Sequence, residues 1–186
     1  MNSQEAIQEA PITMNGINVT SIFDTIKMVQ KDKELAKFQF RATNKWLNGG
    51  HNRSRVKGFY GFGMENEPRA DSFVLDADLP GKDAGPTPLE SILHSLTACL
   101  TTTMVYHAAS RDIAIEAVDS EIEGDLDLRG FLGVSDNVRK GYKRIQVRMR
   151  VKSDAKAETL YELAKFSPVY DMVSGSVPVD LTVETY

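Results

Sequence analysis

Cysteine is scarce in this sequence: among 186 residues, Cys99 is the single cysteine. One thiol excludes an intramolecular disulfide and a cysteine-rich zinc site. Long apolar runs are also missing, since no stretch approaches the roughly 20 residues of a membrane-spanning helix. The first residues show no basic segment followed by an apolar one, which argues against a signal peptide. We therefore expect no membrane partner and a cytoplasmic location.

An excess of positive charge is missing as well. The chain has 22 basic and 26 acidic residues, a formal net charge of −4, which argues against a nucleic-acid partner. The composition is that of a folded globular protein, and the length fits one domain. Three histidines, His51, His94 and His107, are scattered along the sequence, and the glycine-rich run 58–63 opens no helix. We expect neither a metal nor a cofactor.

Apolar periodicity indicates the order of elements. Helical spacing from Val19 to Val29 predicts an amphipathic helix over 18–33, within an N-terminal extension, residues 1–34. Three runs with period two follow, at 37–46, 56–64 and 73–79, and they predict half-buried strands in an antiparallel meander.

A strong helix start lies at Thr87. Thr87 is a good N-cap, Pro88 suits the first helical position, and Glu90 completes a capping box. We expect this helix to run to about Ser110. Few charged residues interrupt it, so we expect burial on most of its surface.

The C-terminal third alternates strands and helices. Residues 117–128 carry an acidic face and residues 144–152 a basic one, which predicts two antiparallel strands with opposite charges across from each other. A helix is expected over 154–165, then a short turn with Ser167 as N-cap, and a strand over 177–183. Together the elements predict an α+β fold.

Cys99 is the first candidate for chemistry. Composition and spacing alone favour a structural core thiol, because free cysteine is usually buried. His94 would lie about 140° around the helix and His107 roughly 12 Å along it, so neither can pair with Cys99 through that helix. A reactive thiol therefore requires a cation from another segment, such as His51.

Two segments resemble the OsmC/Ohr family, the osmotically inducible and organic-hydroperoxide-resistance proteins. The first is Gly85-Pro-Thr-Pro-Leu-Glu-Ser-Ile-Leu-His-Ser-Leu-Thr-Ala-Cys-Leu100, and the second is Leu163-Ala-Lys-Phe-Ser-Pro-Val-Tyr-Asp171. The run 177–183 is similar to the family's last strand. The resemblance implies an OsmC-like domain over 35–186. Its expected fold has two layers, with antiparallel sheets packed on a long central helix, in an intertwined homodimer.

The resemblance also implies thiol peroxidase chemistry. Cys99 matches the family's peroxidatic cysteine, whose thiolate attacks the O–O bond and becomes a sulfenic acid. A second cysteine normally resolves it, and an arginine and a glutamate stabilise the thiolate. Here the resolving position is Ser167, which cannot form a disulfide. Glu90 is adjacent to the family's glutamate position, which Leu89 occupies, and its role as a capping residue is an equal alternative.

The arginine of the family should lie near the turn at 49–50. His51, Arg53 and Arg55 follow that turn, and we favour Arg53. Three functions remain open. The first is a single-cysteine peroxidase that reduces organic hydroperoxides and depends on an external thiol reductant. The second is a non-catalytic homodimer that binds a small apolar or acyl ligand, and the third is a structural homodimer without chemistry.

Overall fold

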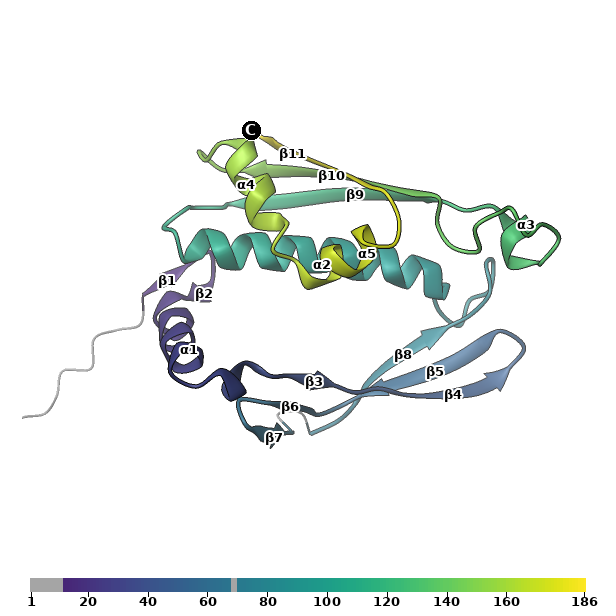
Figure 1. The fold of residues 1–186 in the computed structure, drawn as a ribbon, viewed down its shortest axis with the longest axis horizontal. Helices are drawn as coiled ribbons and strands as arrows, with labels where there is room; N and C mark the ends of the chain where they lie inside the picture. The colour runs from purple at the N-terminus through teal and green to yellow at the C-terminus, as the bar shows by residue number, and fades with distance from the viewer. Residues whose placement is uncertain (1–11, 68–69) are drawn as a thin grey trace, which may run out of the picture.

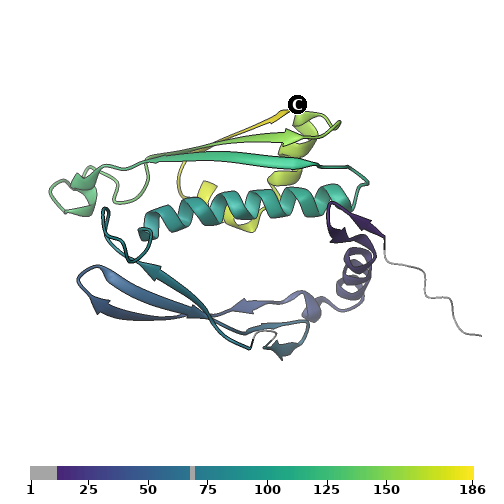
Figure 2. The same ribbon diagram turned by 180° about the vertical axis from the view of Figure 1, so that it is seen from behind.

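The structure, a computed structural model, describes residues 12–67 and 70–186. Helix α2 (Pro88–Ala109) lies between two sets of strands (Figure 1). On one side is the sheet of β9 (Ala117–Asp125), β10 (Arg144–Lys152) and β11 (Val179–Thr185). The strands of the N-terminal half lie on the other side, as the view from behind also shows (Figure 2). The described residues thus form the mixed α+β architecture that the sequence predicts.

The N-terminal residues form a small hairpin and a helix. Strands β1 (Thr13–Met14) and β2 (Ile17–Asn18) pair, and α1 (Val19–Lys31) and the 3-10 helix η1 (Lys33–Ala36) follow. The Asn18 side chain accepts a hydrogen bond from Ser21 N at 3.0 Å and caps α1. The amphipathic helix predicted over 18–33 is confirmed. The division into an extension, 1–34, and a domain, 35–186, stays a prediction, and residues 1–11 lie outside the described residues.

The next strands form two small antiparallel sheets instead of one meander. One sheet contains β3 (Gln39–Phe40), β6 (Phe59–Gly61) and β7 (Met64–Asn66), and the other contains β4 (Thr43–Asn48), β5 (His51–Val56) and β8 (Phe73–Ala77). Apolar periodicity does not predict β5 as a strand of its own, because its residues are mostly polar on both faces. The turn at Gly49 is confirmed, and its φ of +57° suits glycine.

The start of α2 is confirmed at the atomic level. Thr87 Oγ1 accepts a hydrogen bond from Glu90 N at 3.1 Å, and Glu90 Oε2 accepts one from Thr87 N at 2.7 Å. The residues that α2 buries completely follow i,i+4 spacing: Leu96, Leu100, Met104 and Ala108. The expectation of burial on most of the helix surface is wrong for a single chain, because the C-terminal sheet and helices cover only one side of it.

The predicted charge pairing between two strands is confirmed. β9 and β10 are antiparallel, with Arg148 opposite Glu121 and Arg150 opposite Asp119. Strand β11 pairs with β10 in parallel, so this sheet is not antiparallel throughout. The reason is the crossover between them, which contains α4 (Ala157–Ala164) and α5 (Pro168–Ser174). A short helix that the sequence pattern did not predict, α3 (Leu128–Phe131), lies in the connection from β9 to β10.

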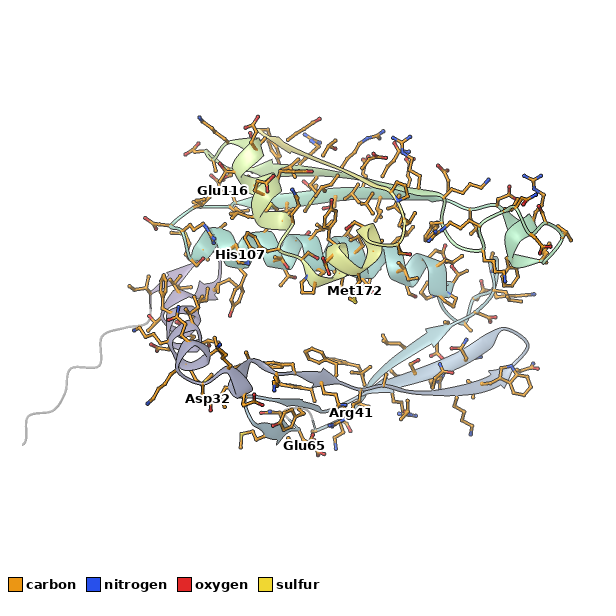
Figure 3. The ribbon with its side chains drawn as sticks, in the orientation of Figure 1. Asp32, Arg41, Glu65, His107, Glu116 and Met172 are labelled. Carbon is orange, nitrogen blue, oxygen red and sulfur yellow. The ribbon has the colours of Figure 1, made fainter. Side chains whose placement is uncertain are left out.

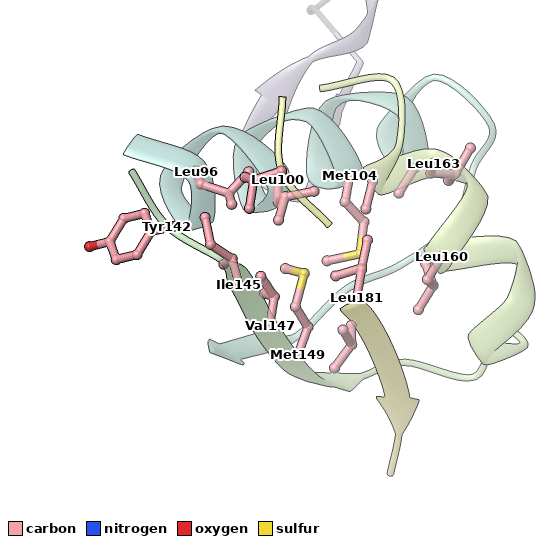
Figure 4. Close-up of a cluster of buried hydrophobic side chains, with 14 residues drawn as sticks. Leu96, Leu100, Met104, Tyr142, Ile145, Val147, Met149, Leu160, Leu163 and Leu181 are labelled. Atoms are coloured by element: carbon pink, nitrogen blue, oxygen red, sulfur yellow. The ribbon is translucent and has the colours of Figure 1, made fainter. Parts of the chain in front are cut away.

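The main hydrophobic core lies between this sheet, α2 and α4 (Figure 4). The apolar residues of β10 alternate with polar or charged ones and face α2. Four of them are at most 1% exposed: Ile145, Val147, Met149 and Val151. Leu160 and Leu163 of α4 close the other side, as their helical spacing predicts. No helix in the described part of the chain is long and apolar enough to cross a membrane.

Apolar side chains of the N-terminal sheets remain uncovered by their own chain. All six residues of β4 are exposed, and Trp46 retains 67% of its surface. Phe40 is 75% exposed even though it packs near Phe38, with ring centroids 6.0 Å apart. The prediction of a half-buried strand at 37–46 is therefore wrong for the single chain, since Phe40 and Trp46 stay largely exposed in the described part of it.

Candidate functional site

Cys99 lies on α2 but outside the hydrophobic core. The thiol is half-buried, and its Sγ is 3.9 Å from Thr103 Oγ1, one helical turn later. The hypothesis of a core thiol is wrong, because Leu96 and Leu100 occupy the stripe of α2 that faces the sheet. Cys99 sits beside that stripe, on a part of the helix that the chain does not fully cover.

No cation contacts the sulfur within the described chain. Among residues 12–67 and 70–186, Thr103 Oγ1 is the only hydrogen-bond partner of Cys99 Sγ. The helix geometry excluded His107 as a partner, and its ring instead stacks on Phe166 with centroids 4.5 Å apart. The described residues of one chain therefore place no hydrogen-bonding cation at the Cys99 sulfur.

Arg53, the favoured arginine, belongs to a cluster of three charged or titratable side chains. Its Nε donates to Asp76 Oδ1 at 2.9 Å and its Nη2 to Asp76 Oδ2 at 3.1 Å. His51 Nε2 lies 2.8 Å from the same Oδ1. Hydrogen bonds from Arg53, and then from His51, lower the pKa of Asp76. The hydrogen bond to Asp76 in turn raises the pKa of Arg53.

This cluster joins strands β5 and β8, because Arg53 and Asp76 are directly opposite each other in the register. Arg55, the third candidate of that strand, lines a hollow together with Arg53, Lys45 and Leu47. The structure brings His51 and Arg53 together but places neither in hydrogen-bond contact with Cys99 within one chain.

Glu90 and Ser167 both serve as helix caps. Hydrogen bonds from Thr87 hold the Glu90 carboxylate and lower its pKa. Ser167 is 1% exposed, and its Oγ accepts a hydrogen bond from Tyr170 N at 3.1 Å, as the predicted N-cap of α5. The geometry thus supports the capping alternative for Glu90.

Sequence reasoning missed two neighbours of the candidate residues. Asp76 was not singled out, because its contact with Arg53 depends on the strand register between β5 and β8, which periodicity does not fix. Thr103 could have been found, since it follows Cys99 at i,i+4 on the same helix face. A group of three or more potential metal ligands does not occur among the described residues.

Solved structures with the same fold include several of the OsmC type. A crystal structure of an OsmC-like protein from Mycoplasma pneumoniae has a TM-score of 0.61 and 15% identity, and the match covers 79% of this chain and 96% of that chain. An OsmC-like protein of unknown function from Vibrio cholerae has a TM-score of 0.57 at 10% identity, covering 78% and 98%. An organic hydroperoxide resistance protein from Elizabethkingia anophelis has a TM-score of 0.52 at 13% identity, covering 80% and 96%. Identities this low establish a common fold only.

Sequence comparison supplies the family. No match was found among curated proteins. Residues 81–182, more than half of the 186-residue chain, match the family described as OsmC-like protein. This segment contains helix α2 with Cys99, both strands of the charged pair and the turn at Ser167. The chain therefore belongs to the OsmC-like protein family.

Proposed function

We propose that this protein is a homodimeric thiol peroxidase in which Cys99 reduces organic hydroperoxides. The observation that carries the proposal is the position of Cys99, half-buried on α2 and outside the hydrophobic core. A core thiol would be inert, whereas a thiol at the margin of an uncovered helix face is accessible to a small substrate.

The homodimer is proposed from apolar surface that one chain leaves open. Phe40, Trp46, Met64, Phe73 and Leu75 are each at least 58% exposed in the N-terminal sheets. Several large apolar side chains exposed on two small sheets are typical of protein interaction sites. A second copy that covers this surface would also approach α2 near Cys99, and it would supply the cation that the described residues of a single chain do not place at the sulfur. We assign that role to the partner's Arg53.

The proposed reaction oxidises Cys99 with the hydroperoxide and then reduces it with an external dithiol. The Cys99 thiolate attacks the terminal oxygen of the hydroperoxide, an S–O bond forms and the O–O bond breaks, and the alkoxide takes a proton and leaves as an alcohol. The sulfur loses two electrons and becomes a sulfenic acid. A thiol of an external dithiol then displaces water to form a mixed disulfide. Its second thiol releases Cys99 and leaves the dithiol oxidised.

Ser167 makes the external reductant necessary. Its hydroxyl cannot form a disulfide, and its Oγ is committed to the α5 cap. No second cysteine is available in the 186-residue chain. Regeneration of Cys99 is therefore intermolecular in this proposal.

A second candidate is the non-catalytic homodimer that binds a small apolar or acyl ligand. The Arg53 guanidinium favours this alternative, because Asp76 already neutralises it and accepts hydrogen bonds from its Nε and Nη2. An arginine that stays in this pair would contribute little to thiolate stability. In that case the open apolar surface would bind a ligand without turnover.

The two candidates differ in turnover. Consumption of cumene hydroperoxide should occur with dithiothreitol as reductant in the wild type and be lost in Cys99→Ser. A rise of the melting temperature with an apolar ligand, retained in Cys99→Ser and without peroxide consumption in the wild type, would favour the binding protein.

A further inference from the structure

A pocket of about 470 Å³ lies between α1 and the C-terminal end of α2. This volume is within the range of about 300–1,000 Å³ that is typical of small-molecule sites. Figure 3 shows His107 on this end of α2, on the side of the molecule where α1 lies. Tyr106 of the pocket is seven residues beyond Cys99, roughly 10 Å along the helix axis. The pocket is therefore separate from the proposed peroxidase site.

The walls of the pocket are apolar. Helix α1 contributes Ile22, Phe23 and Ile26, and α2 contributes Tyr106. Phe23, Ile26 and Tyr106 remain 45%, 40% and 44% exposed, respectively. An apolar molecule placed between the helices would bury this surface at a gain of roughly 25 cal/mol per Å².

The two walls are held at a fixed separation. Asn15 Nδ2 donates to Ile113 O at 2.9 Å, and Asn15 Oδ1 accepts from Ile115 N at 2.9 Å. These two bonds tie the hairpin in front of α1 to the loop after α2. The pocket is thus formed before any ligand arrives, which lowers the entropic cost of binding.

One end of the pocket presents a cation with open hydrogen-bonding capacity. Arg111 Nη1 donates to His107 Nδ1 at 3.1 Å, His107 O at 3.0 Å and Ser110 Oγ at 3.2 Å. Within the described part of the chain, Arg111 forms no ion pair with an acidic side chain, and its Nε and Nη2 make no hydrogen bond. A planar guanidinium anchored through one nitrogen offers this free edge to a carboxylate in bidentate geometry.

His107 positions Arg111. Burial, and then the neighbouring Arg111 charge, lowers the pKa of His107, so its ring is neutral at pH 7. In a neutral ring with the proton on Nε2, Nδ1 can accept the hydrogen bond from Arg111, whereas a charged ring would repel the guanidinium. Stacking on Phe166 fixes the orientation of the same ring.

We propose that this pocket binds a small amphipathic carboxylate, with the carboxylate on Arg111 and the apolar body against Phe23, Ile26 and Tyr106. The free guanidinium edge selects the anion, and the apolar walls select its body. This site requires no chemistry at Cys99. It gives the N-terminal helix a function, because α1 supplies one wall.

The test compares decanoate with decanol, which has the same chain length and no charge. Binding to the full-length protein is measured by titration calorimetry. The wild type should bind decanoate, and Arg111→Gln should weaken that binding by at least about tenfold, while it leaves decanol binding unchanged. Arg148→Gln, on the exposed face of β10, is the matched control and should behave like the wild type.

Two further variants complete the design. Phe23→Ala should weaken both ligands, because it removes part of the apolar wall, and Cys99→Ser should change neither. Melting temperatures confirm that each variant is folded. The proposal is overturned if the wild type does not bind decanoate, as when a second copy covers the pocket, or if Arg111→Gln binds decanoate as well as the wild type does.

Discussion

The Arg53 guanidinium and the Asp76 carboxylate form a two-bond pair across β5 and β8, with N···O distances of 2.9 and 3.1 Å. His51 shares one oxygen of the same carboxylate. The arginine most suited by sequence to act on Cys99 is thus fixed on its own sheet. In the proposed dimer it would approach the partner's sulfur together with Asp76 and His51.

Replacement of Arg53 tests which cation acts on Cys99. Arg53→Gln should slow peroxide oxidation of Cys99 by at least about tenfold, because an adjacent opposite charge favours the thiolate by one pKa unit or more. The rate is measured by stopped-flow with cumene hydroperoxide. Arg55→Gln, two residues along the same strand, is the control and should retain the wild-type rate. Equal rates in all three proteins would remove Arg53 from the mechanism.

Asp76 should make stability dependent on acidic pH. Its pKa is lowered in the folded protein, so its contribution is present above the ordinary value of 3.8 and is lost as pH falls through the folded value. The loss of unfolding free energy on Asp76→Asn should therefore be larger at pH 7 than at pH 3. Urea unfolding at both pH values measures the difference, and Asp83→Asn, in an exposed loop, is the control. A loss that does not depend on pH would contradict the assignment.

Variants of the capping box distinguish a capping role of Glu90 from a role in thiolate stabilisation. Thr87→Ala removes the side-chain acceptor for Glu90 N and should cost about 0.5–2 kcal/mol of unfolding free energy. Glu90→Ala should also lower stability, because it removes the acceptor of the Thr87 N–H, yet leave the rate of Cys99 oxidation unchanged. A large loss of that rate with little change in stability would make Glu90 part of the site instead.

The exposed face of the N-terminal sheets tests the dimer. Phe40→Glu places a charge on a side chain that is 75% exposed in one chain and buried in the proposed interface. The variant should elute as a folded monomer, whereas the wild type and Lys45→Glu should be dimers, as measured by light scattering after size exclusion. A monomeric wild type would contradict the homodimer.

Local signals in the sequence predicted those parts of the fold that depend on neighbouring residues. The box at Thr87 and Glu90 fixed the start of α2, and the opposite charges of two strands predicted their pairing, with Arg148 across from Glu121. These local signals do not predict contacts between segments that are distant in the sequence. The parallel position of β11 follows from the crossover, and the Arg53–Asp76 pair follows from a register that no pattern encodes.

The burial of Cys99 also depends on contacts that local sequence patterns do not predict. Residue frequencies favoured a core thiol, because most free cysteines are buried. The i,i+4 stripe from Leu96 to Ala108 takes the sheet-facing side of α2, which leaves Cys99 at its edge. Which apolar positions of a helix face the core depends on the elements that pack on it, and here they cover only one side.

Intact mass after brief cumene hydroperoxide treatment with dimedone tests most directly whether Cys99 is a peroxidatic thiol. The wild type should gain one dimedone adduct, located at Cys99 by peptide mapping, while Cys99→Ser gains none. A wild-type protein whose mass stays unchanged under these conditions would contradict the account.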